Sequence, residues 1–280
     1  MSLFIAILVP TVLLGALGAV FGLGLAVASR QFAVKTDPRL DEIMAALPGA
    51  NCGACGFPGC SGYAEAIMIK NAGTNLCPVG KSPVAEIIAR IMGKEAVAID
   101  SKLACVFCRG GREETSDNFI YKGIGDCRAA NLVNGGPKAC EYGCLGRGSC
   151  AAACPFGAIV MNDNRLPVVD RKKCTGCGKC VGVCPRGIIA LVKPSEQVFV
   201  YCHSHAKGTE VRKVCKAGCI ACGICVKNCP EKAIEMHDNL AYIDHQKCTG
   251  CGVCVGKCPA KTINYVEPLA KQAIGKETAS

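Results

Sequence analysis

The 280-residue sequence has no tryptophan, and aromatic residues make up only 5% of it. It has no phosphate-binding GxxxxGK[ST] loop, no GxGxxG turn after a strand and no C-x-x-C-H haem attachment sequence. The four histidines, at positions 203, 205, 237 and 245, are scattered, and no nucleophile or acid/base grouping accompanies them. We therefore expect this chain to have no substrate-transforming site of its own.

Cysteine, in contrast, is abundant, at 25 of the 280 residues. Such a fraction is typical of small secreted proteins held by disulfides. Here the number is odd, and most of the cysteines are only two or three residues apart. Cysteines that close in sequence rarely pair with each other, but they readily surround a metal. The pattern disfavours a disulfide framework and favours metal ligation.

The N-terminus is an apolar run. Residues Leu3 to Ser29 carry no charge, and the run is long enough to span a bilayer as one helix. A signal peptide is the alternative, because Ala-Val-Ala-Ser at 26–29 resembles a cleavage site, but nothing basic precedes the run and it is too long. The first basic residues, Arg30 and Lys35, follow it. The positive-inside rule therefore predicts a single-pass protein of the inner membrane with its remaining domains in the cytoplasm.

Three cysteine runs follow the C-x2-C-x2-C-x3-C-P spacing of bacterial ferredoxins. They are Cys174, Cys177, Cys180 and Cys184; Cys219, Cys222, Cys225 and Cys229; and Cys248, Cys251, Cys254 and Cys258. In this motif three thiolates hold one [4Fe–4S] cluster, and the fourth, before the proline, ligates the other cluster of a pair. Zinc ribbons carry separated CxxC pairs instead, so the spacing predicts iron–sulfur clusters.

A fourth run, Cys140-x3-Cys144-x5-Cys150-x3-Cys154-Pro155, departs from this spacing. Arg147 stands where the middle ligand is expected, between Cys144 and Cys150. We expect Cys140, one helical turn upstream, to replace that ligand. Cross-ligation then predicts four clusters. Their ligands are Cys140, Cys144, Cys150 and Cys184; Cys154, Cys174, Cys177 and Cys180; Cys219, Cys222, Cys225 and Cys258; and Cys229, Cys248, Cys251 and Cys254.

The remaining cysteines predict a fifth cluster and leave a sixth open. Cys52, Cys55, Cys60 and Cys77 lie on a glycine-rich loop with C-x2-C-x4-C-x16-C spacing, which suits another [4Fe–4S] cluster, with zinc as the alternative. The other five are Cys105, Cys108, Cys127, Cys202 and Cys215. The first three with Cys202 or Cys215 would make a sixth cluster. A zinc site and spare thiols left from a duplication are the alternatives.

The second half of the chain repeats at an offset of 74 to 75 residues, since Lys173-Cys-Thr-Gly-Cys-Gly recurs from Lys247 and Cys154-Pro-x-x-Ala-Ile recurs from Cys229. We expect an α+β fold with short strands at 158–161, 167–169, 233–236 and 241–243. The predicted parts are a transmembrane helix (1–29), a four-cysteine domain (30–95) with helices at 39–47, 62–72 and 83–92, a connecting segment (96–136), a first two-cluster ferredoxin-like module (137–193), a connector (194–214), a second such module (215–266) and a tail (267–280).

The formal net charge is +10, which would ordinarily suggest an acidic partner or nucleic acid. Five or six oxidised clusters, each bound by four thiolates, together contribute a charge of roughly −10 to −12, which nearly cancels the positive charge of the side chains. Basic residues beside the cysteines, such as Lys173 and Lys247, are then internal counter-charge. We expect no nucleic-acid partner, because no aromatic–basic motif is present.

The order of these parts resembles the B subunits of Rnf complexes, which are ion-translocating ferredoxin:NAD oxidoreductases. The resemblance rests on the N-terminal apolar helix, on Leu-Pro-Gly-Ala-Asn-Cys-Gly-Ala-Cys-Gly-Phe-Pro-Gly-Cys at 47–60 and on the ferredoxin-type runs, and it covers essentially the whole chain. It implies [4Fe–4S] clusters on the ligands paired above. It also implies that the subunit accepts electrons from soluble reduced ferredoxin and relays them to membrane subunits with flavin and iron–sulfur centres. NAD reduction on another subunit would then be coupled to Na⁺ or H⁺ export.

Other interpretations stay open at this point. The 47–60 loop is also similar to a domain of corrinoid iron–sulfur proteins, but a corrinoid methyl carrier needs a large cofactor barrel for which the chain has no room. A relay subunit of another membrane redox complex, such as a hydrogenase, and a zinc-stabilised interaction module are the alternatives. Lys207, Lys213 and Lys216 would steer an acidic ferredoxin, or are simply solvated surface.

Overall fold

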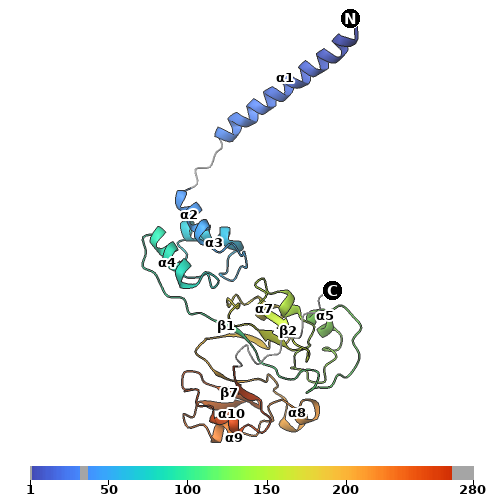
Figure 1. The fold of residues 1–280 in the computed structure, drawn as a ribbon, viewed down its shortest axis with the longest axis vertical. Coiled ribbons are helices and arrows are strands. Elements are labelled where there is room, and N and C mark those ends of the chain that lie inside the picture. The colour runs from blue at the N-terminus through green and yellow to red at the C-terminus, as the bar shows by residue number, and fades with distance from the viewer. Residues whose placement is uncertain (1, 32–36, 267–280) are drawn as a thin grey trace. The chain divides into compact units, whose positions relative to one another are not determined.

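A computed structural model describes residues 2–31 and 37–266 (Figure 1). The tail predicted at 267–280 and most of the linker after the first helix lie outside the described residues. The chain divides into two compact units, residues 1–42 and residues 43–280.

The N-terminal apolar run forms helix α1 (Ser2–Gln31), as predicted. Its Ile7–Gln31 portion is long and apolar enough to cross a membrane. Nearly every side chain of this portion is exposed, including large ones such as Leu14, Phe21 and Leu23. A continuous apolar surface of this kind is stable in hydrocarbon and unfavourable in water.

Three helices lie close to the positions predicted for the four-cysteine domain: α2 (Pro38–Ala46), α3 (Gly59–Ile69) and α4 (Lys81–Ile91). Helix α4 buries Ala85, Ile88 and Ala89, whose three- and four-residue spacing gives the helix one apolar face. Helix α3 buries Tyr63 and Ile67 in the same way. These faces give the small domain its core, while Cys52, Cys55 and Cys77 lie in the loops between the helices and Cys60 lies at the beginning of α3.

The cysteine-rich remainder consists of two parts with the same order of elements. The first module (residues 103–192) runs β1 (Leu103–Val106), α5 (Cys127–Leu132), α6 (Ser149–Ala152), β2 (Ile159–Met161), β3 (Pro167–Val169), α7 (Lys179–Val183) and β4 (Ile189–Val192). The second module (residues 198–265) runs β5 (Val198–Val200), α8 (Gly208–Val214), α9 (Ile224–Lys227), β6 (Ile234–His237), β7 (Leu240–Ile243), α10 (Val253–Lys257) and β8 (Ile263–Tyr265).

The strands of the modules form four two-stranded antiparallel sheets. The inner hairpins, β2–β3 and β6–β7, are the short strands that the sequence predicts. The outer sheets join the first strand of each module to its last, β1 to β4 and β5 to β8. Strands β1 and β5 therefore lie within the predicted connecting segments (96–136 and 194–214) and attach these segments to the modules.

Four short helices of the modules begin after a glycine with a left-handed backbone. These glycines are Gly148, Gly178, Gly223 and Gly252, with φ between 68° and 78°. An L side chain in this conformation costs about 1–2 kcal/mol. Each helix (α6, α7, α9 and α10) then buries the third cysteine of its run. The glycines thus let the loop turn sharply enough to point that cysteine inward.

Gly176 supports a prediction about packing at one of these loops. Its φ is +72°, and a Cβ at this position would lie 2.2 Å from the backbone oxygen of Lys102, just before β1. We expect Gly176→Ala to lower the melting temperature and the iron content of the purified protein, because the backbone strain alone costs about 1–2 kcal/mol. Gly182→Ala in α7 is the matched control, since nothing lies within 4 Å of that position. Equal melting temperatures for the two variants would contradict the prediction.

Candidate metal centres

Two cavities of the second module are each lined by four cysteines. Cys219, Cys222, Cys225 and Cys258 line one, and Cys229, Cys248, Cys251 and Cys254 line the other. Their empty volumes are about 350 and 320 Å³. In each cavity three cysteines belong to one run and the fourth to the other run. The structure therefore brings together the groups that the cross-ligation pattern indicates.

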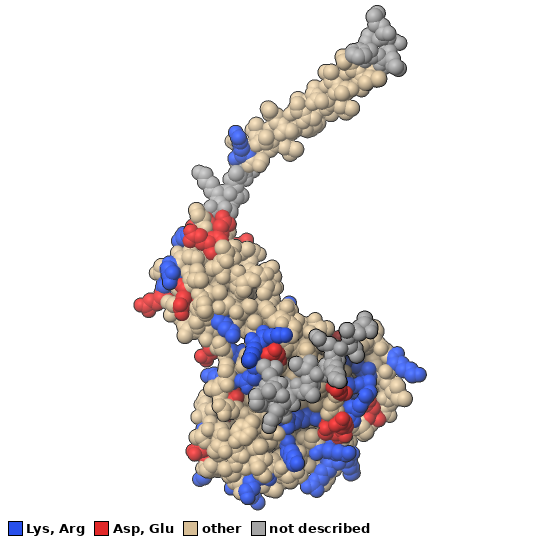
Figure 2. Space-filling model, viewed as in Figure 1, with Lys and Arg blue, Asp and Glu red and all other residues tan. Residues whose placement is uncertain are grey.

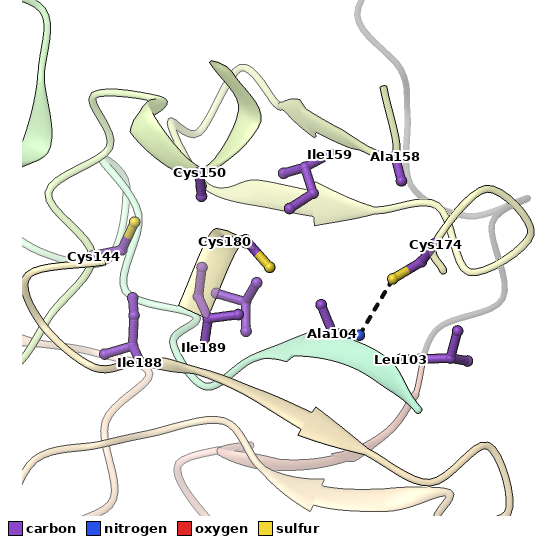
Figure 3. Close-up of a cluster of buried hydrophobic side chains, with 11 residues drawn as sticks. Leu103, Ala104, Cys144, Cys150, Ala158, Ile159, Cys174, Cys180, Ile188 and Ile189 are labelled. Atoms are coloured by element: carbon purple, nitrogen blue, oxygen red, sulfur yellow. Dashed lines mark hydrogen bonds between the residues drawn. The ribbon is translucent and has the colours of Figure 1, made fainter. Parts of the chain in front are cut away.

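Three cysteines of one predicted group of the first module, Cys174, Cys177 and Cys180, also lie near one another. Burial, together with the neighbouring thiols of Cys174 and Cys177, raises the pKa of the Cys180 thiol to about 12. Cys154 packs against the hydrophobic cluster that contains Cys174 and Cys180. Figure 3 shows this cluster, in which the backbone N–H of Ala104 donates a 3.4 Å hydrogen bond to the Cys174 sulfur. Strand β1 thereby contacts the cysteine loop directly.

The other group of the first module differs from the predicted one in a single ligand. Cys127, Cys144, Cys150 and Cys184 line a cavity with an empty volume of about 360 Å³, and Cys140 is not among its lining residues. Burial, together with the neighbouring thiols of Cys127 and Cys184, raises the pKa of the Cys150 thiol to about 11. Cys127 thus occupies the place that the sequence spacing predicts for Cys140.

The hydrogen bonds around Cys127 explain this exchange. Its N–H donates to Ser149 Oγ at 2.7 Å, and Ser149 Oγ donates to Asp126 Oδ2, also at 2.7 Å. Asp126 in turn caps α5 by accepting from backbone N–H groups of its first turn. Arg147, at the position of the missing ligand, lies over the ring of Tyr121 with 4.8 Å between its guanidinium carbon and the ring centre.

Cys140 lies elsewhere, in a cavity that it lines together with Cys108, Cys202 and Cys215. The empty volume of this cavity is about 340 Å³. Two of the four cysteines belong to each module. Sequence spacing alone leaves Cys108, Cys202 and Cys215 without a firm role, although the equal spacing of Cys140-x3-Cys144 and Cys215-x3-Cys219 is a signal of their relationship.

The N-terminal loop holds its cysteines between α2, α3 and α4. Burial raises the pKa of the Cys77 thiol, and the nearby thiols of Cys52 and Cys55 raise it further. Cys60 lies in the first turn of α3, and its N–H donates to Asn51 Oδ1 at 2.8 Å. This bond fixes the beginning of α3 against the residue that precedes Cys52.

Comparison with known proteins identifies the family. A family model described as "Putative Fe-S cluster" matches residues 47–79, and one described as "4Fe-4S dicluster domain" matches residues 139–188 and 218–262. The B subunit of the Na(+)-translocating ferredoxin:NAD(+) oxidoreductase complex of Acetobacterium woodii is 49% identical over 86% of this chain and 73% of its own length. Its proton-translocating counterpart from Clostridium ljungdahlii is 47% identical over 81% of each chain. The B subunit of the ion-translocating oxidoreductase complex of Methanosarcina acetivorans is 42% identical over 84% of this chain and 89% of its own. The chain belongs to the Rnf B subunit family.

An Rnf B subunit is expected to carry [4Fe–4S] clusters, and the residues present here fit that cofactor. Every group consists of thiols alone, the ligand type of such clusters. Backbone N–H groups donate to cysteine sulfurs at 3.4 Å: Gly80 to Cys77, Ala104 to Cys174, Cys144 to Cys108, Ala158 to Cys154, Ser204 to Cys202 and Ala233 to Cys229. Such bonds stabilise thiolate ligands and raise the reduction potential of a bound cluster.

Two further observations complete the description of the cysteines. Within residues 2–31 and 37–266, no three His, Cys, Asp or Glu side chains are placed to hold a single metal ion; four sulfurs around one Zn²⁺ would be about 3.8 Å apart. Cys105 lies in β1 outside all the groups, packed with Val192 and Phe199. Burial raises the pKa of its thiol to about 11.

Tyr63 links the core of the N-terminal domain to its cysteine loop, which yields a prediction. Its hydroxyl donates to Gly73 O at 2.7 Å and accepts from the N–H of Leu76 at 3.0 Å, next to Cys77. We expect Tyr63→Phe to cost about 0.5–1.5 kcal/mol, because both backbone groups lose a partly buried hydrogen bond. The loss should be measurable as a lower melting temperature and as faster release of iron to a chelator.

Tyr242→Phe is the control for this prediction, since the Tyr242 side chain is 59% exposed. If Tyr63→Phe released iron no faster than the control, Tyr63 would not be what holds the Cys77 loop in place.

Proposed function

We propose that this Rnf B subunit accepts single electrons from reduced soluble ferredoxin at its second module and passes them towards the flavin and iron–sulfur subunits in the membrane. The observation that carries the proposal is the series of neighbouring four-cysteine groups in the two modules. When bound there, [4Fe–4S] clusters supply one-electron carriers. The names of the Acetobacterium and Clostridium relatives support NAD(+) as the acceptor of the whole complex, with Na(+) or protons as the coupled ion.

Exposure of the ligands supports the second module as the point where electrons enter. Of the 25 cysteines, Cys222 and Cys251 are exposed, and the others are partly or fully buried. These two residues belong to the two cavities of the second module. A redox partner can therefore approach the ligand groups most closely at this module.

Charge also favours a small acidic donor at this module. Lys207, Lys213 and Lys216 are exposed on or next to α8. Figure 2 shows Lys and Arg side chains around the position of α8 and α9. A basic surface attracts an acidic protein and raises its association rate at low ionic strength.

Direct reduction by ferredoxin tests the proposal. We expect the anaerobically purified full-length subunit, without the other subunits, to be bleached in its iron–sulfur absorbance when it is mixed with reduced ferredoxin. Absence of bleaching, with the clusters still reducible by a small chemical reductant, would contradict the proposal.

The role of the lysines can be tested separately. We expect Lys207→Gln/Lys213→Gln/Lys216→Gln to slow reduction by ferredoxin several-fold at low salt and to have little effect at high salt, because salt screens the attraction. Stopped-flow absorbance measures the rate. The charge-matched control is Lys70→Gln/Lys122→Gln/Lys172→Gln, whose lysines are exposed outside the second module. A control that slows the reaction equally would show that only net charge matters.

We further propose that α1 crosses the membrane once and that both modules lie in the cytoplasm, where they meet ferredoxin. Support comes from the apolar Ile7–Gln31 helix and from the position of the nearest basic residues, with Arg30 in its last turn and Lys35 and Arg39 after it. Protease added to intact spheroplasts is expected to leave the modules uncut, whereas protease added to inverted vesicles should degrade them. The opposite result would place the modules outside.

The proposed domain division is a membrane helix (1–29), a four-cysteine domain (30–95) and two ferredoxin-like modules derived from one duplicated unit, followed by a tail (267–280). The common order of elements and the two matches to the dicluster family support the duplication. The first strand of each module extends it towards the N-terminus, to β1 and β5.

A further inference from the structure

We propose that Cys108, Cys140, Cys202 and Cys215 hold a sixth [4Fe–4S] cluster that the two modules share, and that Cys127 takes the place predicted for Cys140 in the first module. We call the group of Cys108, Cys140, Cys202 and Cys215 the shared site. The inference deepens the electron relay proposed above and rests on it. It uses only residues outside the intact ferredoxin-type runs.

The cavity of the shared site matches those of the ferredoxin-type groups. Its empty volume, about 340 Å³, lies within the range of about 320 to 360 Å³ found for the other three four-cysteine cavities of the modules. Its four thiols are partly or fully buried. The shared site therefore has the same number of lining thiols as each of those three groups.

The four ligands occupy equivalent positions in the two modules. Cys108 comes two residues after β1, and Cys202 comes two residues after β5. Cys140 comes four residues before Cys144, and Cys215 comes four residues before Cys219. Each module therefore contributes one cysteine from the end of its first strand and one from the approach to its first cysteine run. Neither module could complete the site alone.

With Cys127 in the first-module cavity and Cys140 in the shared site, each of these two cavities is lined by four cysteines. Cys127 is held in the first-module cavity by Ser149 and Asp126, which frees Cys140 for the shared site. Six groups of four then include every cysteine except Cys105. That residue packs against Val192 and Phe199 in the hydrophobic core.

A buried lysine lies beside the shared site. Lys138 is 8% exposed, and its Nζ donates to the backbone oxygen of Gly110. Gly110 lines the cavity of the shared site, which places the Lys138 ammonium group next to the four cysteines. A buried ammonium group needs negative charge around it. Iron-bound thiolates at Cys108 and its partners would supply that charge.

The shared site contacts one ligand group of each module. The N–H of Cys144, a ligand of the first module, donates to the Cys108 sulfur at 3.4 Å. On the other side, Gly218, the residue before the second-module ligand Cys219, lines the cavity of the shared site. An electron from ferredoxin that enters the second module would therefore pass through the shared site to reach the first, without any bond being made or broken.

Metal content is the first test. We expect about 24 iron atoms, with equal sulfide and no zinc, per full-length chain purified without oxygen, since six clusters contain four irons each. About 20 irons, with or without one zinc, would overturn the proposal. The variant Cys202→Ala/Cys215→Ala should lose about four irons, whereas Cys105→Ala should lose none. If Cys140 belonged with Cys144, and Cys105, Cys108 and Cys127 formed the sixth site instead, Cys105→Ala would lose about four irons, which would overturn the proposed ligand set.

Reduction by ferredoxin provides the second test and separates this inference from the proposed function. In the double variant we expect ferredoxin to reduce the clusters of the second module while those of the first stay oxidised on the same timescale, as followed by electron paramagnetic resonance. In the wild type both should be reduced. Equal reduction of both modules in the double variant would overturn the bridging role. If ferredoxin reduced neither module of the wild type, the proposed function would fail while the iron count still decided the site.

Discussion

The fold depends on bringing many thiols together at buried positions, where the charged thiolate form is unfavourable. Burial raises the pKa of the thiols of Cys144, Cys180 and Cys202 to about 12. Without a metal these groups would stay protonated at neutral pH, yet only the thiolate ligates iron. Cluster binding must therefore release protons and supply the free energy that holds several negative sulfurs side by side. Folding of the modules and loading of their sites are in this sense one process.

The rest of the fold reflects this dependence. Each sheet has two strands of three or four residues, and a hairpin of that size is at best marginally stable in water. Cysteines make up a large part of both hydrophobic clusters, alongside a few aliphatic residues such as Ile159, Ile188 and Ile234. The modules thus have little core apart from their ligand groups. Left-handed glycines before α6, α7, α9 and α10 shape the backbone to those groups.

Local patterns explain what could be predicted from the sequence. The three intact cysteine runs, the inner hairpins and the helices of the N-terminal domain are each encoded within a short stretch, and the structure places all of them near the predicted residues. Strand β1 could not be predicted in this way, because its four residues are all buried, show no alternation and pair with β4 more than 80 residues later. The position of Cys127 could not be predicted for the same reason, because it depends on contacts between residues far apart in the sequence. Its N–H bonds to Ser149, and Arg147 stacks over Tyr121. Sequence spacing favours the nearest cysteine, Cys140, as the fourth member of this group, whereas the folded chain brings the distant Cys127 to that place.

The exposure of Cys222 and Cys251 has a consequence beyond the transfer of electrons. An iron–sulfur group that a protein partner can approach is also accessible to dioxygen, and exposed thiolates oxidise before buried ones. Oxidative damage should therefore begin at the second module. Under the proposed entry of electrons at the second module, its inactivation would cut ferredoxin off from the first module while the more deeply buried ligands there are still intact. The second module is then both the part of the subunit most easily oxidised and the part whose loss ends electron transfer from ferredoxin.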